Sequence, residues 1–84
     1  MNVFVVFDNV EGKFHKVFTT YKKAKQFLFD QYEKFLFGVQ DEFGLVVDWK
    51  EFQKEKDEFD NTWRVNDFGW IYMITLNDDT DWGY

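Results

Sequence analysis

The sequence contains no cysteine, proline or serine, and its one histidine is His15. Without thiols the chain can form neither a disulfide nor a cysteine-ligated zinc site, the two devices that hold many small domains together. A nucleophile activated by His15 would have to be a threonine, and the five glycines are too scattered to form a phosphate-binding loop. We therefore predict no catalytic residues, no metal, no cofactor and no enzymatic activity.

Long hydrophobic runs are also missing. No segment approaches the roughly 20 apolar residues needed to cross a membrane, and the apolar run at residues 3–7 is too short for the core of a signal peptide. The lack of cysteine is compatible with a reducing compartment. We expect a cytoplasmic protein with no membrane partner.

Aromatic side chains are abundant, with 12 Phe, 4 Trp and 4 Tyr among 84 residues. A chain of this length supports one domain, and a domain this small buries a limited share of its surface. Each buried ring removes ~150 to 250 Å² from water, so we predict that aromatic packing stabilises the fold. The predicted domain spans residues 1–76, followed by an acidic, flexible tail at residues 77–84.

The net charge of −6 is unevenly distributed along the chain. Residues 1–37 carry six lysines and four acids, a net +2, whereas residues 38–84 carry twelve acids and four basic residues, a net −8. An acidic surface repels a phosphate backbone and attracts basic proteins. We expect no direct nucleic-acid binding and a protein partner with a basic surface; the alternative is that the charge serves only solubility.

Two segments near the N-terminus predict an antiparallel hairpin. Residues 3–7 form a β-branched and aromatic run, and because both of its faces are apolar we expect a central strand. Residues 13–19 alternate, which places Phe14 and Phe18 on one face and His15 on the other, solvated face. A loop of hairpin length joins the two strands.

A helix is predicted for residues 21–37. Thr19 and Thr20 supply a hydroxyl for its N-cap, and Gly38 is a natural residue to follow its end. At about 100° per residue its apolar side chains cover an arc of roughly 200°. This stripe is wider than one sheet face needs, so either a second helix covers its flank or part of it is an interaction surface.

The next segment predicts a second helix after a stretch of undecided structure. Residues 38–47 could form a loop or a short strand, because Gly44 interrupts any helix there. Asp48, with Glu51 three residues later, is a variant of the capping box. A helix over residues 49–59 follows from this start and from its apolar spacing.

The last strong pattern is a second hairpin, with strands at residues 63–65 and 70–76 around a turn that contains Gly69. The elements therefore follow the order ββααββ. This order predicts an α+β fold in which a small antiparallel sheet of about four strands has two helices packed on one face.

The later half of the chain supplies the predicted contact surface. Surplus aromatic rings rimmed by charge are typical of protein interfaces, and carboxylates spaced along a helix can replace phosphates in a basic groove. The predicted partner-binding residues are Asp41, Glu42, Asp48, Glu51, Glu55, Asp57, Glu58, Asp60, Phe68 and Trp70. The alternative is that the rings pack inside the domain or stand singly exposed.

In size and composition the chain is similar to phage-encoded accessory and anti-defence proteins, which include anti-CRISPR inhibitors and nucleic-acid mimics. This likeness is carried by small size, acidity, aromatic content and lack of proline, and by no motif. It implies a small acidic inhibitor that acts on a basic surface of its partner. A second prediction, from another class, is a structural or self-associating protein, homodimeric through its broad aromatic surface and without catalytic activity.

Overall fold

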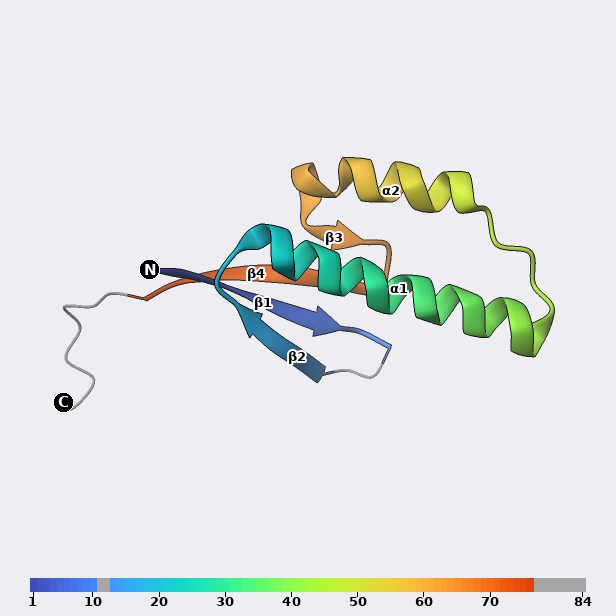
Figure 1. Cartoon of the computed structure of the whole chain (residues 1–84), viewed down its shortest axis with the longest axis horizontal. Helices are drawn as coiled ribbons and strands as arrows, with labels where there is room; N and C mark the ends of the chain where they lie inside the picture. Colours follow the sequence, from blue (N-terminus) through green and yellow to red (C-terminus); the bar gives the residue numbers. More distant parts are fainter. Residues whose placement is uncertain (11–12, 77–84) are drawn as a thin grey trace.

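The structure, a computed structural model, describes residues 1–10 and 13–76, with the backbone alone for residues 13–15. Its elements are β1 (Asn2–Asp8), β2 (Lys13–Phe18), α1 (Tyr21–Phe43), α2 (Trp49–Thr62), β3 (Arg64–Val65) and β4 (Gly69–Thr75). The strands form one antiparallel sheet in the order β2-β1-β4-β3, and both helices lie on the same side of it (Figure 1). The predicted α+β fold class is therefore confirmed. The predicted flexible tail and the predicted position of the His15 side chain lie outside the described part.

β1 is a central strand, as its two apolar faces predict. It pairs with β4 over its whole length and with β2 on its other side. On the β2 side, Val5 and Phe7, two residues apart, lie opposite Val17 and Phe14, three residues apart. This β-bulge interrupts the strict alternation predicted for residues 13–19, because one extra residue of β2 is accommodated opposite β1.

α1 begins where the sequence predicts and ends later. Thr20 has extended backbone angles, and its hydroxyl accepts the backbone N–H of Lys23 at 3.3 Å, which is N-cap geometry. The prediction that Gly38 follows the end of the helix is wrong. The helix continues to Phe43, and its C-cap is Gly44, which has a left-handed φ of 64°. A single glycine inside a helix costs only about 1 kcal/mol relative to alanine, too little to end a helix whose apolar stripe continues.

α1 is longer than the sheet beneath it. Its 23 residues extend about 34 Å at 1.5 Å per residue, whereas the seven residues of β1 extend about 23 Å. The second part of the helix therefore overhangs the sheet, and Figure 1 shows it passing the ends of the strands. Phe35, Phe37 and Phe43 remain exposed on this overhang, although α2 covers one flank of the stripe.

Aromatic rings join the two helices in the core. The buried cluster consists of Val6, Ala24, Leu28, Phe29, Tyr32, Phe59, Val65, Phe68 and Ile71. The ring of Phe29 on α1 makes edge-to-face contacts with Phe52 and Phe59 on α2, with ring centres 5.8 and 5.2 Å apart. Such pairs contribute about 0.5 to 1.5 kcal/mol each beyond their burial, so ring packing fixes α2 against α1.

α2 begins at the predicted cap and extends to Thr62. One oxygen of Asp48 accepts the backbone N–H groups of Lys50 and Glu51 at 3.0 and 3.2 Å. The C-cap is Trp63, with a left-handed φ of 57°, so this residue ends the helix and is not the strand residue that was expected. Its indole stacks on Tyr21 with ring centres 5.0 Å apart. That packing offsets the strain of a bulky residue in the left-handed region.

The close approach of β4 to β1 requires glycine at position 69, because a Cβ there would lie 2.5 Å from the carbonyl oxygen of Phe7 and 3.0 Å from Cδ1 of Leu28. We expect Gly69→Ala to lower the free energy of unfolding by about 1 to 3 kcal/mol. The matched control is Gly38→Ala, which adds the same atom where nothing lies within 4 Å and should raise stability by about 0.5 to 1 kcal/mol. Urea denaturation measures both, and equal effects would contradict the packing described.

Candidate binding groove

A groove lies between the overhanging part of α1 and the start of α2. The open prediction for residues 38–47 is resolved as a helix end followed by a loop, since residues 38–43 extend α1 and residues 44–48 have no regular secondary structure. Figure 1 shows this connection at the far end of α1. The groove has a volume of about 300 Å³. α1, the connection and α2 all contribute to its walls.

The floor of the groove is apolar and open to solvent. Val46, in the connection, is 97% exposed. Tyr32 and Leu36 of α1 line both the groove and an adjoining hollow of about 350 Å³ that also contains Phe35 and Phe68. The two hollows therefore form a continuous apolar strip along α1, and exposed apolar strips rimmed by polar residues mark binding sites.

Carboxylates follow one flank of α2 beside the groove. Asp48, Glu51, Glu55 and Glu58 are spaced three or four residues apart, so they share one side of the helix. The first three line the groove directly. Among the side chains of residues 1–10 and 16–76, no lysine or arginine nitrogen lies within 4.0 Å of any of the four. Ion pairs with these described side chains therefore do not neutralise the four charges, and we call this row the acidic rim.

Glu55 lies deepest in the acidic rim. Its Oε1 accepts a hydrogen bond from Nδ2 of Asn66 at 2.5 Å, and the same nitrogen donates to the hydroxyl of Tyr32 at 3.3 Å. Its Oε2 is buried and has no hydrogen-bond partner in the described part of the chain. Burial, followed by the negative charge of Glu55, raises the pKa of the Tyr32 hydroxyl. Tyr32 therefore stays neutral, and the carboxylate of Glu55 keeps one acceptor that the described residues do not use.

The charges on α1 run against its macrodipole. Its first turn carries Lys22 and Lys23 and no acid, while its last turn carries Asp41 and Glu42 and no basic residue. Acids at a helix C-terminus destabilise it by about 0.3 to 1 kcal/mol each, so helix stability does not explain them. Glu42 follows Val39, a groove residue, by three positions and lies near that face; Asp41 lies on the other side.

Two predicted acids lie on the opposite flank of α2. Asp57 accepts a hydrogen bond from Gln53 at 3.0 Å. Asp60 accepts hydrogen bonds from the hydroxyl of Tyr21 at 2.5 Å and from Nζ of Lys25 at 3.1 Å. Asp60 therefore ties the end of α2 to the start of α1 and is not part of the acidic rim.

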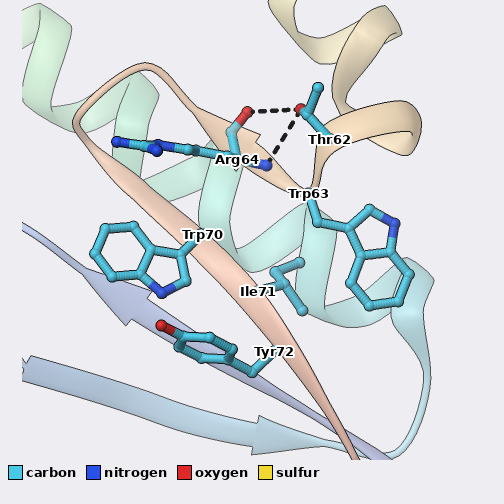
Figure 2. Close-up of a pocket in the computed structure, with 6 residues that line it drawn as sticks. All are labelled: Thr62, Trp63, Arg64, Trp70, Ile71 and Tyr72. Atoms are coloured by element: carbon cyan, nitrogen blue, oxygen red, sulfur yellow. Dashed lines mark hydrogen bonds between the residues drawn. The ribbon is translucent and has the colours of Figure 1, made fainter.

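The two predicted aromatic anchors lie on different sides of the sheet. Phe68 is only 6% exposed and packs on Tyr32 in the core, with ring centres 4.9 Å apart. Trp70 lies on the opposite face, where its ring centre is 4.3 Å from that of Phe7 and the guanidinium of Arg64 lies 5.9 Å above it (Figure 2). The ten predicted residues thus do not form one surface.

No protein-family model matches the sequence, and comparisons with curated proteins and with solved structures find no match. In the described part of the chain, no group of three or more histidine, cysteine, aspartate or glutamate side chains is arranged to hold a metal ion. No helix there combines the length and the apolar character needed to cross a bilayer.

Sequence reasoning missed the apolar floor of the groove and its polar base. Leu36 and Val39 belong to an apolar helical stripe, and the sequence does not show which part of such a stripe is buried. Asn66 has the residue type and position of an ordinary turn residue. One signal was available: the apolar run at residues 45–47 stands between two charged segments. A run that short cannot be assigned from its periodicity.

The contact of Asp60 with Tyr21 predicts a pH-dependent contribution to stability. The Tyr21 hydroxyl, and then Lys25, hold the pKa of Asp60 below its usual value. A group whose pKa is lowered by folding stabilises the protein above its unfolded pKa, about 3.9 for aspartate, and that stability is lost as the pH falls through the folded pKa. Asp60→Asn should therefore lower the free energy of unfolding at pH 7, and the difference from wild type should shrink in acid.

Urea denaturation at neutral and acidic pH checks this expectation. The control is Asp30→Asn, because Asp30 is exposed and, among the described residues, accepts a hydrogen bond only from Gln26, four residues away on the same helix. It should leave the free energy of unfolding nearly unchanged at both pH values. A difference between Asp60→Asn and wild type that stays constant with pH would show that the Asp60 charge is not involved.

Proposed function

We propose that this protein is a non-catalytic protein-binding module of the cytoplasm, and that its groove receives apolar and basic side chains of a partner protein. One observation carries the proposal: the apolar floor is open to solvent and ends at the carboxylate of Glu55, one buried oxygen of which has no hydrogen-bond partner among the described residues. An unsatisfied buried acceptor costs about 1 to 3 kcal/mol. Once the Glu55 side chain turns toward the groove, a lysine or arginine of the partner would satisfy this oxygen with a charge-assisted hydrogen bond.

The charge of the rim specifies the kind of partner. Asp48, Glu51 and Glu55 face the groove without ion pairs in the described residues, so a cationic partner is attracted and an anionic one is repelled. Apolar side chains of the partner would cover Leu36 and Val46 at the same time. A short amphipathic segment with arginines or lysines beside an apolar stripe meets both requirements.

An inhibitor of the phage-encoded, anti-defence type is one role that such a module could fill, by occupying a basic surface of a nucleic-acid-handling protein. The spacing of the charges argues against mimicry of nucleic acid by charge alone. The acidic rim places about one charge per helical turn of 5.4 Å, whereas each DNA strand carries one per about 3.4 Å. Specificity would have to come from the apolar floor as well.

Titration of a basic peptide tests the proposal. The probe is a synthetic amphipathic helix with leucines on one face and arginines beside them, followed by fluorescence anisotropy. We expect binding that weakens as salt rises, and a loss of about 10-fold or more in affinity for Glu55→Gln, which removes the charge but keeps an acceptor for Asn66.

Two controls accompany that titration. Asp57→Asn also replaces a carboxylate by an amide, but on the opposite flank of α2, and should alter the affinity for the peptide by no more than about two-fold. A peptide of equal charge with scrambled leucines should bind more weakly, because it cannot cover the floor. Equal binding by Glu55→Gln and Asp57→Asn, or binding that ignores salt, would contradict the proposal.

A second candidate function, self-association of a structural protein, is favoured by the face of the sheet that neither helix covers. Val17 and Ile74 on that face are exposed by 62% and 47%, and Val5 lies between β2 and β4 on the same face. Exposed apolar side chains on a sheet face that no helix covers are suited to contact another protein surface.

A further inference from the structure

The backbone groups of β4 alternate between its two neighbours. Met1 and Leu76, which lie opposite each other where β4 meets β1, exchange both backbone hydrogen bonds, at 2.7 and 3.0 Å. In an antiparallel ladder, one such pair determines which residues of the strand direct their backbone N–H and C=O groups toward that neighbour and which direct them away. The N–H and C=O groups of Ile71, Met73 and Thr75 therefore point away from β1, toward the other edge of β4.

β3 covers only the beginning of that edge. Its two residues pair with Gly69 and Trp70, and the carbonyl of Trp63 accepts the N–H of Ile71 at 3.0 Å. Figure 2 shows β4 continuing past this point, beyond Ile71 and Tyr72. Among the residues that the structure describes, no strand pairs with Met73 or Thr75 on this side.

In the described part of the chain, β4 lacks the charged side chains that usually protect a strand edge from pairing. β2, at the opposite edge of the sheet, contains Lys13 and Lys16, and lysines on an edge strand discourage pairing with another chain. β4 contains no charged residue. In a chain of net charge −6, a neutral strand is also the place where two copies can approach with little repulsion.

We propose that β4 pairs antiparallel with β4 of a second copy, across a two-fold axis that passes through Ile74. The inference rests on the second candidate function, self-association, and is independent of the groove. With Ile74 opposite its own copy, Met73 of each chain lies opposite Thr75 of the other. The outward backbone groups of these two residues then form four hydrogen bonds, and the two sheets join into one.

The side chains fit a second copy as the occupant. The two Ile74 residues would face each other as a non-hydrogen-bonded pair. In an antiparallel ladder this type of pair brings the two side chains closer together than a hydrogen-bonded pair does. Each Ile74 is 47% exposed before pairing. Met73, exposed by 48%, lies on the side of the sheet that faces the helices. The paired stretch is short, so the dimer should be weak, with a Kd of roughly 10 µM to 1 mM.

Sedimentation velocity over this concentration range tests the pairing with a matched pair of variants. Thr75→Pro removes the outward N–H, which makes no bond to β1, and Thr75→Ala keeps it. Both variants lose the bond from the Thr75 hydroxyl to Asn2. We expect Thr75→Ala to dimerise like wild type within about two-fold, and Thr75→Pro to dimerise at least about 10-fold more weakly. Circular dichroism confirms that both fold.

A second pair of variants does not depend on proline. Ile74→Lys sets two positive charges opposite each other on the axis and should abolish dimerisation, whereas Ile74→Thr keeps a neutral β-branched residue and should weaken it only modestly. A wild-type protein that stays monomeric near 1 mM overturns both this inference and the self-association candidate. A wild-type dimer that persists in Thr75→Pro and Ile74→Lys overturns the edge pairing alone and leaves self-association through another surface.

Discussion

The structure depends on a mismatch in length between α1 and the sheet. A helix of 23 residues lies across strands of at most seven, so only its first part can bury its apolar stripe on them. α2 covers part of the remainder, through Phe52 on Tyr32 and Trp49 on Phe37. What α2 leaves uncovered is the groove and the exposed phenylalanines of the α1 overhang, Phe35, Phe37 and Phe43. The candidate binding surface is therefore a consequence of helix length and of aromatic packing between the helices.

Acidic side chains lie beside exposed apolar side chains at the overhanging end of α1. The acids at the end of α1 oppose its macrodipole, and the acidic rim of α2 lacks ion pairs among the described residues. Both features reduce stability slightly and both raise the attraction for a cation beside an apolar floor. The edge of β4 is the opposite kind of surface, since it is neutral and offers backbone groups. The fold thus offers two proposed contact surfaces of different chemistry, one acidic and apolar and one formed by backbone groups.

The sequence predicts the elements well where local chemistry decides them. Thr20 and Asp48 cap the helices as expected, because an oxygen at the N-cap satisfies unpaired N–H groups whatever the tertiary context. The end of α1 was predicted wrongly at Gly38, since a single glycine destabilises a helix too little to end it. Glu51, Glu55, Asp57 and Glu58 were correctly placed on a helix, whereas Asp60 lies beyond its predicted end at residue 59. The role of Asp60 as a tie to Tyr21 and the burial of Phe68 require the tertiary structure.

Backbone NMR of residues 36–48 tests the central claim most directly. If α1 continues through Gly38 and overhangs the sheet, the Cα chemical shifts should remain helical to Phe43 and become non-helical at Gly44, and Val39 should show contacts with the apolar residues of the connection. If helical shifts end at Phe37, there is no overhang. The groove would then have no floor, and the proposed binding surface would not exist.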